Sequence, residues 1–475
     1  MASALLLPPG PKCTLLLGNM PEFNRDTLAF ITSCHQQYGD IVRTRFLYLS
    51  AYFLFHPEYI EYVLSTNYRN FIKSQSLRSP FFRRLVGNGL VTSEGDLWRR
   101  QRRLAQPAFH RDRIAAYGKV MVDYTERMLA TWRDGELRDI HRDMTRLTQN
   151  IVVKTLFNAD LSAEADEIGT ALRGMVKPFA SQATLKWILD NRLPTPGNRR
   201  FNRAVEKIEQ VIYRIIRERR ASGRDEGDLL SMLLEAQDED GTQMSDEQLR
   251  DEVMTLFLAG HETTALALSW AWYLLSEHPQ VEANLLAELG EVLGGRTPSF
   301  EDLPRLRYTE MIIKESLRLY PPAYAVGRQA VGECEIGGYR VPAGTQLFMF
   351  QWVVQRDPRY FDRPEEFIPA RWGEGLTSRL PKYAYFPFGG GPRSCIGNTF
   401  AMSEAVLLLS TISQRFHLRL SAEHRVTITP AMSLRPSEGI WMTVKKRSGE
   451  GKYYAESQKW SIASPHENRQ VGCPK

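Results

Sequence analysis

The chain has 475 residues, of which 43% are hydrophobic and 24% charged, so it is long enough for one large core and is not of the intrinsically disordered class. A net charge of +6 suits an acidic protein partner or an anionic surface, but it does not by itself indicate nucleic-acid binding. Five scattered cysteines, an odd number, do not indicate a disulfide framework and fit a reducing cytoplasm.

The N-terminal twenty residues contain two leucine runs, at 5–7 and 15–17, which are divided by prolines and a glycine at 8–11. Neither run approaches the ~20 apolar residues that span a bilayer, and the charged leader of a secretory signal is missing. We therefore expect no transmembrane anchor and a soluble, cytoplasmic protein.

Residues 38–63 mix turn residues with β-branched and aromatic ones, which predicts two strands followed by a helix. Residues 74–91 read as a loop that carries several large apolar side chains. A predicted helix then holds Trp98 and Arg102, four residues apart on one face, where an indole N–H and a guanidinium can reach the same anion. The neighbouring arginines could instead form a solvated face or a nucleic-acid patch, but their cluster is short.

The pattern from 113 to 220 is chiefly helical, with a break at 193–197. The longest helical run, 249–275, is apolar on nearly every side, as expected of a helix through the middle of a large domain. Charged residues at its centre exclude a membrane span.

Residues 259–264 of this run read Ala-Gly-His-Glu-Thr-Thr. The Thr263 hydroxyl can bond the carbonyl of Ala259, four residues back, and open a groove beside Gly260 for a small ligand. Together with Glu262 it offers a hydroxyl and a carboxylate for passing protons. Taken alone, a structurally satisfied Glu–Thr pair would look the same.

A further helix is predicted at 311–320, ended by two prolines. It holds Glu315 and Arg318 on one face, and Arg371 lies in the segment Pro-Glu-Glu-Phe-Ile-Pro-Ala-Arg that ends there. We interpret these charges as scaffolding, since breaking a buried pair leaves a costly unpaired charge. Residues 337–355 predict short strands around turns, and the polar tail at 448–475 is expected to be disordered, which leaves 1–447 as one domain.

The segment 388–397 reads Phe-Gly-Gly-Gly-Pro-Arg-Ser-Cys-Ile-Gly. Three glycines from Gly389 onward allow positive φ angles, so that amide N–H groups can turn toward one sulfur, and a helix predicted from Asn398 places Cys395 before its N-terminus. Both features favour a thiolate over a thiol. One thiolate cannot build a structural zinc site, but it can hold haem iron from one side.

In that interpretation Arg393 pairs with a haem propionate, Phe388 shields the sulfur from water, and Gly397 lets the helix start press against a flat ring. A glycine-rich turn with a buried structural cysteine is the alternative.

The segment resembles the haem-binding loop F-x-x-G-x-R-x-C-x-G of the cytochromes P-450. Three other motifs of that family occur in its order: W-x-x-x-R, A-G-x-[DE]-T-T, and E-x-x-R followed by P-E-x-F-x-P-x-R. The resemblance covers about residues 8–446. It implies a mainly α-helical domain with small β-sheets, in which a long oxygen-binding helix lies over a haem and the cysteine loop lies beneath it.

The resemblance also implies roles for single residues. Haem b would be held by the axial thiolate of Cys395, and Thr263 and Glu262 would be the catalytic pair. The implied cofactor-binding residues are Trp98, Arg102, Ala259, Gly260, Arg328, Phe388, Gly389, Arg393, Cys395 and Gly397. The implied substrate pocket is formed by Phe81, Phe82, Leu85, Phe179, Ala259, Ala325 and Val326, although core or membrane packing would give the same apolar pattern. Glu315, Arg318 and Arg371 would form the structural network.

The implied reaction inserts one oxygen atom of O2 into a C–H bond of a lipophilic substrate. With no flavin or iron–sulfur segment in the chain, electrons would come from a separate ferredoxin or flavodoxin and its NAD(P)H reductase, docking at the arginines beside Arg102. Residues 259–264 and 320–322 resemble the fatty-acid hydroxylase branch, so a long-chain fatty acid is expected, with a terpenoid or steroid as alternative. A haem-binding sensor or carrier and a donor-independent isomerase are alternatives from other classes. We expect a monomer that binds no nucleic acid.

Overall fold

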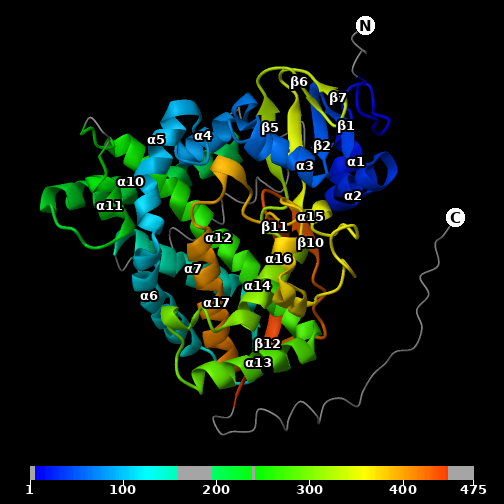
Figure 1. Ribbon diagram of the computed structural model, residues 1–475. Coiled ribbons are helices and arrows are strands. Elements are labelled where there is room, and N and C mark those ends of the chain that lie inside the picture. The colour runs from blue at the N-terminus through cyan, green and yellow to red at the C-terminus, as the bar shows by residue number, and fades with distance from the viewer. Residues whose placement is uncertain (1–5, 159–194, 238–240, 448–475) are drawn as a thin grey trace, which may run out of the picture.

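Helix α12 (Asp246–Glu277) runs through the middle of the molecule (Figure 1). Its first turn is capped by the Ser245 side chain, which accepts a hydrogen bond from the backbone N–H of Gln248. Most of its residues are buried, which explains why the sequence is apolar on almost every side of the helix. In this computed structural model, residues 6–158, 195–237 and 241–447 are described.

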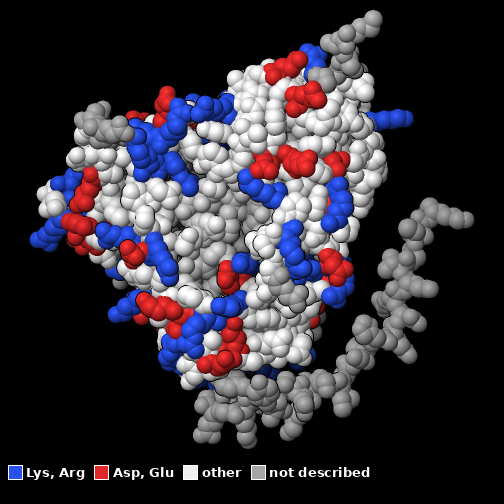
Figure 2. Space-filling view, in the orientation of Figure 1, with Lys and Arg blue, Asp and Glu red and all other residues white. Residues whose placement is uncertain are grey.

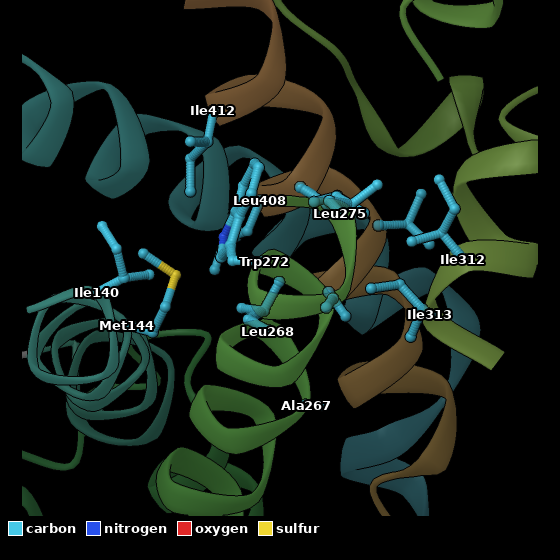
Figure 3. Close-up of a cluster of buried hydrophobic side chains, with 14 of the residues drawn as sticks. Ile140, Met144, Ala267, Leu268, Trp272, Leu275, Ile312, Ile313, Leu408 and Ile412 are labelled. Atoms are coloured by element: carbon cyan, nitrogen blue, oxygen red, sulfur yellow. The ribbon is translucent and has the colours of Figure 1, made fainter. Parts of the chain in front are cut away.

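The helices that pack directly around α12 include α7 (Ile140–Phe157), α14 (Arg307–Leu319) and α17 (Asn398–Arg415). Figure 3 shows their interlocking side chains: Ile140 and Met144 approach from α7, Ile312 and Ile313 from α14, and Leu408 and Ile412 from α17. On α12 itself, Leu268 and Trp272 lie at the centre of this cluster. The main core is therefore built between helices, and it fixes α12 relative to α17.

The other α-helices of the described residues surround this centre. They are α1 (Met20–Arg25), α2 (Thr27–Tyr38), α3 (Pro57–Glu61), α4 (Pro80–Val86), α5 (Gly95–Ala105), α6 (Arg111–Leu129), α10 (Pro196–Ser222), α11 (Leu229–Glu235), α13 (Pro279–Leu293), α15 (Gln351–Val354) and α16 (Leu376–Arg379).

A five-stranded sheet covers the upper right of the molecule in Figure 1. Its strand order is β1 (Ile41–Phe46), β2 (Leu49–Leu54), β8 (Gln346–Met349), β5 (Val326–Ala330) and β3 (Phe71–Lys73). The β2–β8 pair is parallel and the other pairs are antiparallel. The β3–β5 register places Lys73 opposite Arg328, so two cationic residues meet at this edge of the sheet.

The described residues also form three smaller sheets. One joins β4 (Glu136–Asp139), β12 (Trp441–Lys446) and β9 (Phe416–Leu420), and the two hairpins are β6 (Cys334–Ile336) with β7 (Tyr339–Val341) and β10 (Ile428–Pro430) with β11 (Leu434–Pro436). The predicted class, mainly helical with small β-sheets, is confirmed. No helix among the described residues is both long and apolar enough to cross a membrane.

Local differences from the sequence predictions have physical reasons. The segment at 74–91 contains α4 instead of being a loop throughout, because Ser79 caps a helix whose first residue is Pro80. The predicted strands after residue 337 end at Met349 and are followed by α15. The tail at 448–475 lies outside the described residues, so its predicted disorder stays a prediction.

Candidate active site

The cysteine loop before α17 is held closed by its own backbone. The N–H of Cys395 donates to the carbonyl of Phe388 at 2.9 Å, and Gly389 and Gly391 adopt φ angles of +67° and +65°. A side chain at Gly391 would place its Cβ only 1.8 Å from the carbonyl oxygen of Leu64, so glycine is required there for space as well as for conformation. The loop thus presents Cys395 three residues before the first residue of α17.

The Cys395 thiol is exposed, yet enough of the chain surrounds it that burial raises its pKa. The backbone N–H of Gly397 and the guanidinium of Arg102 act in the opposite direction without overcoming burial. The expectation that the loop alone favours a thiolate is therefore not met. A metal cation at the sulfur would supply the missing stabilisation.

Gly397 has a different environment from Gly391. Its φ of −89° is accessible to any residue, and an added Cβ would meet only the Phe109 ring, at 3.7 Å. Contacts within the protein therefore do not require glycine at this position. Open space at the start of α17, beside Cys395, fits a flat group such as a haem ring.

A group of cations, hereafter the cation cluster, lies beside this loop: Lys73, Arg102, Arg328 and Arg393. Lys73 is buried, and burial together with Arg328 and Arg393 holds its pKa well below the ordinary value. Burial and Arg393 lower the pKa of Arg328 to about 10. Desolvation and mutual repulsion both disfavour these charges, so the cluster is incomplete without further anions.

Glu94 supplies one carboxylate to the cation cluster. It forms an ion pair with Arg393 and accepts a hydrogen bond from the backbone N–H of Lys73. Among the described residues, it is the acidic group whose charge acts on Lys73 and Arg328. Four cations and one carboxylate leave an excess of positive charge that suits the two propionates of a haem.

The predicted Trp98–Arg102 pair is present on one face of α5, but each residue also contacts the cysteine loop. The guanidinium carbon of Arg393 lies 4.3 Å from the centre of the buried Trp98 ring. Arg102 donates from Nη1 to the carbonyl of Ser394 at 2.8 Å. Helix α5 and the cysteine loop are thereby fastened together around the cation cluster.

On α12 the predicted Thr263 hydrogen bond is present, from Oγ1 to the carbonyl oxygen of Ala259 at 2.8 Å. Ala259 and Thr263 are exposed, although most residues around them on the helix are buried. An added Cβ at Gly260 would approach Val152 of α7 to 3.3 Å. The helix therefore opens at Ala259 and Thr263 while remaining tightly packed on the side of Gly260.

Glu262 of the same motif is directed toward the β10–β11 hairpin. Its Oε1 accepts a hydrogen bond from Ser433 Oγ at 2.6 Å and forms an ion pair with Arg435. Burial raises the pKa of this carboxyl, but Arg435 and Ser433 outweigh it and hold the pKa below its ordinary value. The motif thus contains an ionised carboxylate that is engaged with a neighbouring element.

The three charged residues expected to form a network are brought together. Glu315 accepts hydrogen bonds at 2.9 Å from both Arg318 and Arg371. Two partners were not foreseen, the Trp372 indole N–H at 2.9 Å and the Ile368 backbone N–H at 3.0 Å.

The residues expected in a substrate pocket have different surroundings. Ala325 and Val326 are half-buried at the start of β5. Phe81, Phe82 and Leu85 are buried in α4, where the Phe81 ring stacks on Phe201 of α10 with centroids 4.4 Å apart. Phe179 lies outside the described residues.

Sequence reasoning missed Lys73, Glu94, Ser433 and Arg435, because none of them stands in a recognisable motif and their partners are distant in the chain. It also missed Met432, an exposed residue in the hairpin turn beside Ser433.

Comparisons with known proteins extend over nearly the whole chain. A model of the family "Cytochrome P450" matches residues 8–444. Two proteins of Streptomyces melanosporofaciens are 40% identical: cyclooctatin synthase, with 88% of this chain and 91% of the relative covered, and cyclooctat-9-en-7-ol 5-monooxygenase, with 86% and 89%. Pentalenene oxygenase of Streptomyces avermitilis is 35% identical, with 90% of this chain and 92% of the relative covered.

A solved structure of cyanobacterial CYP120A1 with retinoic acid bound is 24% identical, covers 94% of this chain and 100% of its own, and gives a TM-score of 0.84. That likeness shows the fold. The family model and the relatives show the family as well: the chain belongs to the cytochrome P450 family.

Proposed function

We propose that this cytochrome P450 monooxygenase hydroxylates a terpenoid. The observation that carries the proposal is the set of relatives named for cyclooctatin, for cyclooctat-9-en-7-ol and for pentalenene, all of them terpenoids. The expected fatty-acid substrate finds no support among them, and the terpenoid alternative replaces it.

The charges near the oxygen motif support the same choice. A fatty acid needs a cation for its carboxylate, but Arg435 is already engaged by Glu262 and Ser433. The neighbouring exposed side chains, Ala259 and Met432, are apolar. Such surroundings favour a largely hydrocarbon substrate.

We infer that the cofactor is haem b and that Cys395 is its thiolate ligand. When bound, the haem activates dioxygen, and its thiolate ligand favours O–O cleavage. Trp98, Arg102, Arg328 and Arg393, together with Lys73, would hold the propionates. In this arrangement the negative charge of the propionates compensates the excess of the cation cluster.

Two residues of α12 are assigned to proton movement. Thr263 keeps its hydroxyl at the exposed part of the helix by donating to the Ala259 carbonyl, so its oxygen can accept a hydrogen bond from a small ligand or a water there. Glu262, held ionised by Arg435, accepts protons from the hairpin side and passes them toward Thr263.

Electrons come from a separate acidic donor protein, a ferredoxin or flavodoxin with its reductase. A surface groove of about 540 Å³ lies beside the cation cluster and includes Arg99, Arg102, Arg103 and His110. The exposed Arg103 and Arg99, of which Arg99 is paired with Asp96, give it a basic rim, which favours docking of an acidic surface.

The first test is the carbon monoxide difference spectrum of the reduced protein, which distinguishes a thiolate-bound haem from one with another axial ligand. Spectral titrations with diterpene and sesquiterpene hydrocarbons and alcohols, steroids and long-chain fatty acids then rank the substrates. Terpenoids should shift the haem spectrum and yield hydroxylated products when donor proteins and NAD(P)H are present. A clear preference for fatty acids would overturn the substrate assignment but not the family.

A further inference from the structure

The segment before α1 forms an ordered edge outside β1. The backbone N–H of Arg43 donates to the carbonyl of Pro9 at 2.8 Å, and Gly18 pairs with Phe46. In Figure 1 this segment runs along the upper right edge of the molecule. The second leucine run of the sequence, which the proposed function does not use, lies within this edge.

Residues 14–18 form a tight turn, hereafter the leucine turn. The backbones of Thr14 and Gly18 exchange hydrogen bonds of 3.0 and 3.1 Å, and Arg45 Nη2 donates to the carbonyl of Leu15 at 2.8 Å. Gly18 has a φ of +67°, and an added Cβ would lie 2.0 Å from the carbonyl oxygen of Arg45. These contacts fix the backbone of the turn against β1.

The leucine turn directs its apolar side chains outward. Leu15 and Leu16 are 87% and 80% exposed, and Tyr48, in the β1–β2 turn beside it, is 79% exposed. The N–H of Leu47 donates to the carbonyl of Leu17 at 3.2 Å, which holds the two turns together. Because hydrogen bonds fix the conformation of the turn, its adjacent leucines remain exposed to water in the folded protein. They form apolar surface that the fold itself does not bury.

The charged side chains of this N-terminal edge and of the adjoining β1–β2 hairpin have one sign. Residues 6–19 and 41–50 contain Lys12, Arg43 and Arg45 and no acidic residue. Lys12 and Arg43 are exposed, whereas Arg45 is partly buried against the turn. Figure 2 shows this edge of the molecule as mostly uncharged, with a basic side chain projecting from it. Exposed leucines and an aromatic residue flanked by cations match the interface of an anionic bilayer, where apolar insertion and electrostatic attraction add.

We propose that the leucine turn, with Tyr48 and the flanking Lys12 and Arg43, is a peripheral contact that seats the protein on an anionic membrane surface. The contact requires no helix that spans the bilayer. The leucines and the tyrosine enter the headgroup region, while the two cations remain among the lipid phosphates. The contact does not depend on the identity of the substrate, although it would bring the enzyme to a compartment where lipophilic compounds dissolve.

The test is co-sedimentation of the full-length, haem-loaded protein with vesicles made of equal parts phosphatidylcholine and phosphatidylglycerol, and separately of phosphatidylcholine alone. The protein should bind the anionic vesicles, more weakly at high salt. Replacing both leucines, Leu15→Ser with Leu16→Ser, should weaken binding by at least about tenfold. Lys12→Gln and Arg43→Gln should each weaken it by about fivefold.

The matched control is Leu137→Ser, which removes a leucine that is 52% exposed on β4. It should leave vesicle binding unchanged, and all variants should keep the carbon monoxide difference spectrum of the parent. Equal losses in the control, or equal binding to uncharged vesicles, would overturn the proposal. It would also be overturned if the protein ignored vesicles but formed a dimer that the leucine variant abolished, since the turn would then be an interface between copies.

Discussion

The Glu315 network and the cation cluster are two groups of buried charged side chains. They differ in how many of their hydrogen-bond and ion-pair partners the chain itself provides. Around Glu315, hydrogen bonds reach the carboxylate from Arg318, Arg371 and Trp372, and Arg318 also donates to the carbonyls of Gln355 and Glu366. In the cation cluster, four positive side chains share one carboxylate, Glu94. A buried group whose charges are all paired within the chain stabilises the fold. A buried group with an excess of positive charge is suited to bind an anionic ligand.

The largest expected effect on stability comes from a substitution in the Glu315 network. Arg318→Leu removes a fully buried guanidinium and leaves Glu315 with unmet hydrogen-bonding capacity, so the free energy of unfolding should fall by about 3–5 kcal/mol. Chemical denaturation of the apoprotein measures it. The control is Lys382→Gln, which breaks an exposed ion pair with Glu61 and should cost at most about 1 kcal/mol. Equal losses in the two variants would show that the Glu315 network is not structural.

Two buried carboxyls without a cation partner extend the comparison. Burial raises the pKa of Glu404, which lies beside Thr264, and that of Glu252 to about 8, from ordinary values of 4.5. Each folded-state carboxyl keeps its proton up to about pH 8, whereas the unfolded chain loses it near 4.5. Stability contributed by each group is therefore present below pH 4.5 and is lost as the pH rises toward 8, by about 1.4 kcal/mol per pH unit.

Glu404→Gln should remove about half of this slope, and the double variant with Glu252→Gln should remove most of it. Denaturation of the apoprotein at several pH values between 4.5 and 8 measures the slope. A slope unchanged in the double variant would mean that both carboxyls ionise within the folded protein.

A substitution in the cation cluster should affect the stability of the apoprotein in the opposite way to one in the Glu315 network. Arg328→Leu removes a desolvated charge that Arg393 repels, so the stability of the apoprotein should stay constant or rise. Haem retention should instead fall about tenfold or more, since a charge-assisted hydrogen bond contributes about 1.5–3 kcal/mol. The rate at which haem is lost to an excess of an apo acceptor protein measures haem retention. A loss of apoprotein stability as large as in Arg318→Leu would contradict the distinction between the two groups.

The sequence predicts the contacts that lie within one helix and misses those that depend on strand register. The Thr263–Ala259 bond follows from a spacing of four residues, and Glu315–Arg318 from a spacing of three. By contrast, Lys73 meets Arg328 only because β3 pairs with β5 in one particular register. No local pattern around Lys73 distinguishes it from a surface lysine.

Burial explains a second kind of failure. Amide groups and a helix N-terminus near Cys395 predicted a stabilised thiolate, but desolvation by the surrounding chain raises the pKa of the thiol more than the Gly397 N–H and Arg102 lower it. The Glu262 carboxylate was placed in the right motif, yet its partner Arg435 lies 173 residues away on a hairpin that the motif does not describe. Motifs identify residues, whereas pairing between distant elements sets their charge states.

The Glu262–Arg435 pair is intermediate between the two charge groups, since one partly exposed carboxylate meets one partly exposed guanidinium and the hydroxyl of the buried Ser433. Arg435→Gln should lower the stability, but by less than Arg318→Leu does, because both partners of this pair are partly exposed. Its main effect should be on proton delivery: with Arg435 removed, burial raises the pKa of Glu262, so the pH midpoint for product formed per electron consumed should shift upward. Ser433→Ala should give a smaller shift in the same direction, and Glu262→Gln should abolish this pH dependence. Product and peroxide yields measured across pH separate these outcomes, and a midpoint that does not move in Arg435→Gln would show that Glu262 takes no part in proton transfer.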